Sequence, residues 1–291
     1  MIKFEKIEAY GWEPAIRGMR NSHDSWDKSD SVWVECLEAS SDEYIFVERA
    51  GEQGFWVGPV DQELMLRLSR AGSDHRKFMR MINVYMDIVA PMYWWKEMDT
   101  YAIGKVQNSC STMHSITKNK FTIYDFSHDN LDTNRDLVMH NPNEYHFSSF
   151  DFLKLTVDVL NQWRERYLVA LKTEEETGLP AKDIWWQIIQ LLPSSYNQRR
   201  TVMLNYEVLR NIYHARKNHK LDEWRAFCRV IEVLPFSELI TGANHPTITV
   251  NGKDVLMSVN AYCKVNGLDA VEDIPVIEKH NVTCKEEKDN V

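Results

Sequence analysis

Long apolar runs are missing from this chain of 291 residues. A membrane helix needs about 20 consecutive apolar residues, and Asn83 and Asp87 interrupt the most apolar stretch of the chain. The first residues, Met1 to Glu8, lack the apolar block followed by small residues that a secretory signal requires. We therefore expect no membrane partner and a cytoplasmic location.

Cysteine is scarce and positive charge is in deficit. The five cysteines are far apart and form no C-x-x-C pair, which argues against a disulfide scaffold and a structural zinc site. The histidines show no spacing that would place two ligands on one helix face, so no metal is expected. With 34 Lys and Arg against 43 Asp and Glu, the formal charge of −9 argues against a nucleic-acid partner. A local arginine cluster can still bind a phosphate group in such a protein.

Glycine-rich nucleotide signatures and the hydrolase elbow are also absent: the chain has no G-x-G-x-x-G, no Walker loop and no G-x-S-x-G. What it does have is a globular composition, with 44% hydrophobic and 26% charged residues. Its ten tryptophans suffice for a large aromatic core. The length allows one large domain or two ordinary ones.

Alternating and helical patterns occur side by side, which predicts an α+β fold. Strands are predicted at residues 2–10 and 78–91. Helices are predicted at residues 61–71, 151–172, 184–192, from 195 or 197 to 216, and at 221–234. The polar residues 21–60 are expected to form a long loop or insertion, in which a short strand at Tyr44–Glu48 is an option.

Turn and capping residues add detail to this prediction. Asp61 is expected to cap the helix that follows it, and Gly72 to end that helix. Asn251-Gly252 suits a two-residue type I′ turn, which predicts a β-hairpin over residues 247–256. The last ten residues of the sequence are charged and are expected to be frayed.

The densest basic region surrounds Arg199 and Arg200. If residues up to Arg216 form one helix, Asn205 and Arg216 lie at the two ends of an otherwise apolar face. Such a face suggests a half-buried polar site that binds an anion. The alternative is that these arginines pair with surface carboxylates, and spacing alone leaves both open.

A run of small polar residues, Asn108-Ser109-Cys110-Ser111-Thr112, is the second candidate for a site. Hydroxyl and backbone N–H groups can hold a phosphate if such a run opens a helix. An ordinary polar loop or a set of N-cap residues explains the same run equally well. Cys110 could act as a nucleophile, although an isolated cysteine is more often a small buried residue.

Two stretches of the chain resemble the flavin-dependent thymidylate synthase (ThyX) family. The first is Leu192-Pro193-Ser194-Ser195-Tyr196, followed by Asn205, Asn211, Arg216 and Glu223-Trp224. It is similar to the family's C-terminal run, where a Leu-Pro and an aromatic residue precede a helix with flavin-contacting asparagines and a nucleotide-contacting arginine.

The second stretch leads from Ala90-Pro91 to residues 108–114 and resembles the family signature in position and in Asn108 and Ser111. Tyr101-Ala102-Ile103 stands where the family has Arg-His-Arg, and further arginine and glutamate positions of the signature also differ. His75 falls in the place of the family's His-Gly-His segment, and Ser22 in that of its early flavin-contacting serine. The resemblance covers about residues 1–240, with an insertion near 25–58.

The resemblance implies a central mixed or antiparallel sheet with long helices in a domain of residues 1–242, followed by an extension over 243–291. It implies an enzyme that binds FAD and dUMP across the subunits of a homotetramer. NADPH and methylenetetrahydrofolate would be the co-substrates for reductive methylation of dUMP to dTMP. The implied flavin contacts are Ser22, His75, Asn205 and Asn211. The candidate nucleotide contacts are Asn108, Ser109, Ser111, Arg199, Arg200 and Arg216, and the candidate catalytic residues are Arg216 and Cys110.

Two alternatives follow from the altered signature. The same scaffold could carry a different pyrimidine-nucleotide chemistry, with Cys110 attacking uracil C6 as its boldest form. Alternatively, the chain could be a non-catalytic relative that binds a nucleotide or a flavin. Both remain open at the level of the sequence.

Overall fold

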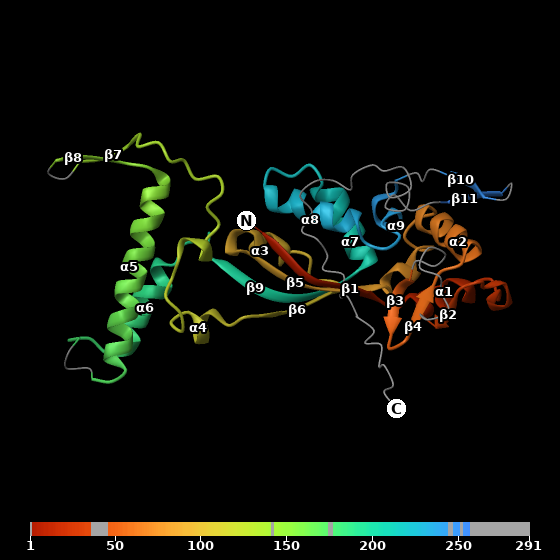
Figure 1. The fold of residues 1–291 in the computed structure, drawn as a ribbon, viewed down its shortest axis with the longest axis horizontal. Coiled ribbons are helices and arrows are strands. Elements are labelled where there is room, and N and C mark those ends of the chain that lie inside the picture. The colour runs from red at the N-terminus through yellow and green to blue at the C-terminus, as the bar shows by residue number, and fades with distance from the viewer. Residues whose placement is uncertain are drawn as a thin grey trace, which may run out of the picture.

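A four-stranded antiparallel sheet forms the centre of the molecule (Figure 1). The structure is a computed structural model that describes residues 2–35, 46–140, 143–173, 177–243, 247–250 and 253–256. The strand order is β1 (Lys3–Tyr10), β5 (Asn83–Pro91), β9 (Asn197–Asn205) and β6 (Lys105–Ser109). The α+β prediction is confirmed, and so is the strand expected at residues 2–10.

Strand β9 and the helix that follows it correct the predicted helix over residues 195–216. Residues Asn197–Asn205 are a strand, and α7 spans Tyr206–Arg216. Along the strand, Arg200, Val202 and Leu204 are buried, whereas Arg199 and Thr201 are exposed. This period of two is that of a strand with one covered face. Helix α7 starts where the Asn205 side chain accepts a hydrogen bond from the Val208 N–H at 3.0 Å.

Helices α3 (Met92–Met98), α7, α8 (Asp222–Glu232) and α9 (Glu238–Thr241) lie over one face of the sheet (Figure 1). Their core is aromatic: the ring of Trp94 lies 4.9 Å from that of Trp95 and 4.9 Å from that of Trp224. All three indoles are fully buried. Helix α8 confirms the helix predicted at residues 221–234, since its apolar stripe faces this core.

The predicted loop over residues 21–60 is wrong for the described part of that range. It contains η1 (Trp26–Lys28) and a three-stranded antiparallel sheet of β2 (Val32–Glu35), β3 (Phe46–Ala50) and β4 (Gln53–Trp56). The optional strand at Tyr44–Glu48 overlaps β3. Glu48 of β3 accepts from the Gly11 N–H at 2.9 Å and so caps α1 (Trp12–Asn21). These strands are too short to show a clear alternation of polar and apolar residues in the sequence.

Asp61 does not cap α2 (Pro59–Arg70), as the sequence had suggested. It lies inside the first turn, fully buried, and accepts from Arg20 at 2.6 Å and from Ser29 at 2.6 Å. The capping acceptor is Asp30, whose carboxylate accepts from the Val60 and Asp61 N–H groups. The end of the helix is as predicted, because Gly72 follows α2 with a φ of +110°.

Helices α5 (Ser149–Ala170) and α6 (Ala181–Leu191) pack together at the opposite end of the molecule from α1 and α2 (Figure 1). Both confirm predicted helices. They share a second, smaller core, which contains Leu153, Val157, Leu160 and Ile188. The short elements around them are α4 (Thr112–Ser115), η3 (Ile123–Asp125), β7 (Leu137–His140) and β8 (Glu144–Phe147).

The remaining predictions concern two short segments. Residues Lys77–Arg80 form the turn η2, so the strand predicted at 78–91 begins only at Asn83. Strands β10 (Thr247–Val250) and β11 (Lys253–Leu256) pair as the predicted hairpin. Its turn at residues 251–252 and the predicted frayed tail lie outside the described residues, and the boundary at 242 stays a prediction. No helix in the described ranges has the length and apolar character needed to span a membrane.

Candidate functional site

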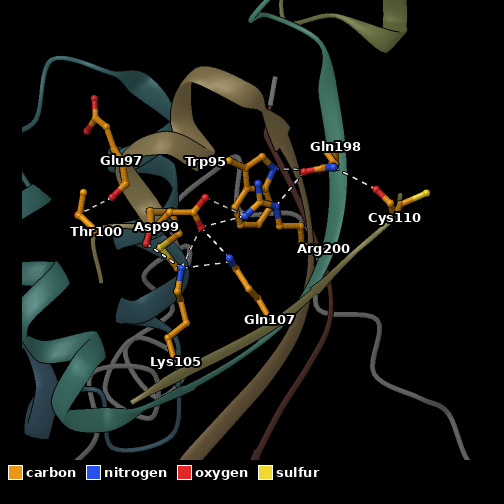
Figure 2. Close-up of polar contacts among 10 residues, drawn as sticks. Trp95, Glu97, Asp99, Thr100, Lys105, Gln107, Cys110, Gln198 and Arg200 are labelled. Atoms are coloured by element: carbon orange, nitrogen blue, oxygen red, sulfur yellow. Dashed lines mark hydrogen bonds and ion pairs between the residues drawn. The ribbon is translucent and has the colours of Figure 1, made fainter. Parts of the chain in front are cut away.

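Charged side chains gather where α3 ends, between the sheet and helices α7 and α8. Helix α3 buries Trp94, Trp95 and Met98. Asp99 follows these positions and reaches toward β9 and β6 (Figure 2), and Glu97 between them contacts Arg216 at the end of α7. We call this set the α3 polar network. Its members are Glu97, Asp99, Tyr101, Lys105, Gln107, Gln198, Arg200, Arg216, His219 and Trp224.

Glu97 organises the half of the network that contains Arg216. Its Oε2 atom accepts from Nη1 of Arg216 at 3.0 Å and from the indole Nε1 of Trp224 at 2.8 Å. The ring nitrogen of His219 lies 3.5 Å from the same oxygen, an ion pair when the imidazole is protonated. The Arg216 guanidinium also donates to the Tyr101 hydroxyl and lies 4.9 Å from the Trp224 ring centre. Arg216 is therefore held by a carboxylate, a hydroxyl and an aromatic face.

Asp99 organises the half that contains Arg200 (Figure 2). Nη1 of Arg200 donates to Oδ1 of Asp99 at 2.9 Å, and its Nε donates to the Gln198 side chain at 2.9 Å. The guanidinium lies 4.3 Å from the ring centre of Trp95, whose indole N–H donates to the Gln198 carbonyl oxygen. Because the Arg200 side chain is only 9% exposed, this pairing supplies the counter-charge that a buried guanidinium needs.

Lys105 adds a second buried cation beside Asp99. Its side chain is 4% exposed, and its Nζ donates to the Met98 carbonyl at 2.9 Å, to Asp99 and to Gln107. Burial lowers the pKa of Lys105, and Asp99 offsets part of that shift. For Asp99, burial alone would raise the pKa, but hydrogen bonds from Gln107 and the charge of Arg200 bring it below its usual value. This half of the network thus places two cations around one carboxylate.

The polar run 108–112 meets the network through Gln198. Its Nε2 donates to the Cys110 carbonyl at 3.0 Å (Figure 2). The same nitrogen donates to the Thr112 hydroxyl at 3.1 Å. Asn108 and Ser109 belong to the edge strand β6, and Ser111 is the N-cap of the four-residue helix α4. The N-cap interpretation is therefore confirmed for Ser111.

Cys110 is exposed, which corrects the expectation of a small buried residue. Its Sγ lies 3.5 Å from the Ser115 hydroxyl. Among the described residues, the thiol has no hydrogen bond to a histidine, lysine or carboxylate that could activate it as a nucleophile.

Arg199 and Arg200 point to opposite faces of the sheet. Arg199 is half exposed on the face opposite to α3, α7 and α8, which no described helix covers; there Nη2 lies 3.0 Å from Glu5 and Nη1 lies 3.7 Å from Asp87. Asn108 is exposed on β6, in register with Thr201 on β9. Within one chain, a single phosphate cannot contact both arginines, because neighbouring residues of a strand alternate between faces.

The residues that the resemblance assigns to flavin fall in two places. Asn205 caps α7, and Asn211 is exposed on the same helix. His75 lies in the exposed turn after α2, which Arg76 joins to α7 by donating to Glu207 at 2.8 Å. Ser22 lies at the end of α1, where its hydroxyl donates to the Met19 carbonyl. No described contact joins Ser22 to the other three residues.

Sequence reasoning missed the acidic half of the network. Glu97 and Asp99 were not singled out, nor were the buried Lys105 and Gln107. The available signal was local: two carboxylates follow a buried Trp94-Trp95 pair at the end of a short helix. Among the described residues, no group of three His, Cys, Asp or Glu side chains is placed to hold a metal ion.

The described geometry can be compared with known proteins. No family model matches the chain, and no curated protein matches it. Among solved structures, it is similar to a thymidylate synthase X from Helicobacter pylori with FAD and dUMP, at 16% identity and a TM-score of 0.51. The match covers 83% of this chain and 98% of that one. A second structure of the Helicobacter pylori enzyme with FAD and dUMP matches at 15% identity and a TM-score of 0.48, over 81% of this chain and 98% of that chain. The first match shows that this chain has an α+β fold like that of thymidylate synthase X.

Proposed function

We propose that this chain is a flavin-dependent thymidylate synthase-like enzyme that converts dUMP to dTMP. The observation that supports the proposal is the likeness in fold to an enzyme that holds FAD and dUMP, over 98% of that enzyme's length. In this proposal methylenetetrahydrofolate supplies the one-carbon unit and NADPH the reducing equivalents. A bound FAD supplies the hydride chemistry, so the protein has to bind, orient and shield the reactants.

Asn205 fits a flavin contact in its local geometry. Its Oδ1 accepts from the Val208 N–H, whereas no described group accepts from its Nδ2, which leaves this amide able to donate to a ligand. The neighbouring Gly104 has a φ of +75°, and a Cβ there would lie only 2.7 Å from Nδ2. A glycine is therefore required beside this amide. Asn211, His75 and Ser22 are the further flavin contacts of the proposal.

For the nucleotide, we assign Arg216 to the uracil or ribose and the phosphate to donors around β9 and β6. Candidate donors are Arg199, Arg200, Asn108, Ser109 and Ser111. The Arg216 guanidinium lies 5.7 Å from the ring centre of the half-buried Tyr101, which could offer a stacking surface, and 4.9 Å from that of Trp224, which is fully buried and supports the arginine. The ligand has to compete with Glu97 for this arginine, which makes the network a binding site with an internal anion already in it.

A homotetramer is part of the same proposal, and the open face of the sheet supports it. On this face Tyr10 and Tyr85 are 36% and 42% exposed, and Val106 on β6 is 62% exposed. Exposed apolar side chains that gather on one sheet face are typical of a surface that another subunit covers. Arg199 lies on this face, so it would serve a nucleotide held mainly by another copy of the chain.

The proposal is tested by spectroscopy followed by turnover. The purified protein, or the protein mixed with FAD, is expected to show the absorption of a bound flavin that changes when dUMP is added. With NADPH and methylenetetrahydrofolate present, label is expected to leave carbon 5 of [5-²H]dUMP. A protein without flavin absorption after mixing with FAD and removal of the unbound FAD would contradict the proposal.

A second candidate is favoured by one observation: Arg200 and Arg216 are both already paired with carboxylates. This arrangement suits the same scaffold with altered pyrimidine-nucleotide chemistry, or a relative that binds a nucleotide or flavin without turnover. Flavin and dUMP binding without loss of label from carbon 5 would favour this candidate. If Cys110 attacks uracil C6 in an altered reaction, Cys110→Ser abolishes turnover but not nucleotide binding.

A further inference from the structure

A cavity of about 360 Å³ lies between the end of α1, the turn η1 and the outer face of α2. Its lining residues are Arg20, His23, Ser25, Lys28, Val60, Glu63, Leu64 and Arg67. No member of the α3 polar network belongs to this lining. Its volume falls within the ~300–1,000 Å³ that is typical of small-molecule sites.

The wall of this cavity is basic in an acidic protein. Lys28 and Arg67 are exposed, and neither makes an ion pair with any residue that the structure describes. Glu63 is the acidic residue of the lining. In a chain with a formal charge of −9, three cations around one cavity are a local concentration that favours an anionic ligand.

Arg20 gives the cavity a buried donor. Its side chain is 4% exposed; Nε donates to Asp61 at 2.6 Å, and Nη1 donates to the Ser25 carbonyl at 3.1 Å. The remaining nitrogen, Nη2, is buried and has no acceptor within the described part of the chain. A buried charged donor without an acceptor is unfavourable, and an anion in the cavity would relieve this cost after a small shift.

The surrounding geometry keeps Arg20 in this position. Asp61 accepts not only from Arg20 but also from the hydroxyls of Ser29 and Ser31 at 2.6 and 2.7 Å. Asp30 in turn accepts from the first N–H groups of α2. The segment after α1 is therefore tied to the start of α2 through Asp61 and Asp30, which fixes this wall of the cavity before a ligand binds.

We propose that this cavity binds a small organic phosphomonoester. The phosphate lies between Lys28 and Arg67 with Arg20 at its base, where charge-assisted hydrogen bonds are strong. The organic part lies against Val60 and Leu64, the apolar residues of the lining. The inference goes beyond the proposed function, because the site shares no residue with the nucleotide and flavin contacts proposed above.

The test uses the full chain and measures binding of glycerol 3-phosphate and of inorganic phosphate by calorimetry. Lys28→Ala together with Arg67→Ala is expected to weaken binding of the ester by at least about tenfold. Glu63→Gln is expected to tighten it by about two- to fivefold, since a nearby like charge is removed. A loss of structure would not produce opposite signs in these variants.

Two controls separate this site from general charge effects and from the proposed nucleotide site. Lys172→Ala with Lys182→Ala removes the same charge from exposed positions near α5 and α6 and should leave affinity within about twofold. Arg199→Ala should also leave it unchanged, even if dUMP binding is lost. Absence of millimolar binding, or unchanged binding in the Lys28/Arg67 variant, would overturn the proposal. Tighter binding of inorganic phosphate than of the ester would overturn the assignment of an ester.

Discussion

The α3 polar network and the cavity between α1, η1 and α2 differ in how their cations are paired. In the network, Arg200 and Arg216 each pair with a carboxylate, at 2.9 and 3.0 Å. In the cavity, Arg20 is paired, whereas Lys28 and Arg67 have no ion pair among the described residues. The two regions therefore differ in what an arriving anion meets: an internal competitor in the first, and free positive charge in the second.

This difference shows that the burial of a cation limits its availability to bind a ligand. A guanidinium that is almost fully buried requires a counter-charge in the same chain, because the desolvation of an unpaired charge is costly. Exposed cations carry no such requirement and remain free to bind. In the network, the buried Arg200 and the partly buried Arg216 maintain the structure first, and a ligand has to replace their carboxylate partners. In the cavity the buried Arg20 is held by Asp61, and the exposed cations provide the affinity.

The largest expected effect comes from Asp61, which anchors the cavity. Asp61→Asn leaves Arg20 buried without its counter-charge and weakens the hydrogen bonds to Ser29 and Ser31. We expect the free energy of unfolding to fall by about 3 kcal/mol, as measured by urea denaturation. Asp74→Asn is the matched control, because Asp74 is 90% exposed and only 4.0 Å from Lys77. Equal losses in both variants would mean that the burial of Asp61 does not account for its effect on stability.

Much of the fold could be predicted from the sequence, except where the two-residue period of a strand runs directly into the 3.6-residue period of a helix. Helices α5 and α8 have apolar stripes long enough to be read correctly. The sequence predicts a helix in place of strand β9, because the apolar residues of 197–205 continue into the apolar stripe of α7 without a break. The boundary at Asn205 was visible only as one capping residue, and a cap signal is weak beside a long apolar stretch.

The candidate site was harder to predict than the fold. The resemblance pointed to Arg216 and the density of basic residues to Arg200, and both lie in the network. Their carboxylate partners lie 101 and 119 residues away in the chain. No local pattern in the sequence records such a pairing, since it depends on how α3 packs against β9 and α7. The cavity was missed for the same reason, because Arg20, Lys28 and Arg67 come together only after residues 21–60 fold.

An intermediate effect is expected at Glu97, on ligand binding and not on stability. Glu97→Gln keeps an oxygen to accept from Trp224 but removes the charge that holds Arg216. If Arg216 contacts the nucleotide, dUMP should bind about fivefold more tightly, which corresponds to ~1 kcal/mol. Arg216→Ala should weaken dUMP binding in the same titration. If neither change alters the affinity, Arg216 is purely structural and the network is not the nucleotide site.

The smallest expected effect is that of Asp99 on the pH dependence of stability, which can be compared with that of Asp61 at low and high salt. Hydrogen bonds from Ser29 and Ser31 and the charge of Arg20 outweigh burial and hold the pKa of Asp61 below its usual value, and the pKa of Asp99 is also lowered. A carboxyl whose pKa is lowered by folding stabilises the protein above its unfolded pKa, and this stabilisation is lost as pH falls through the folded pKa. Because the side chain of Asp99 is 44% exposed, solvent screens its ion pairs, and its contribution to the free energy of unfolding should stay below about 1 kcal/mol.

The measurement is the free energy of unfolding against pH for Asp99→Asn and the unchanged protein. The variant should show only a slightly weaker loss of stability at acid pH. Salt at 0.5 M (about 4 Å Debye length) should remove most of the difference between the two proteins. The acid dependence that Asp61 contributes should persist in that salt, because its carboxylate is fully buried. An Asp99 contribution that equals that of Asp61 and resists salt would show that the network is as well shielded as the wall of the cavity.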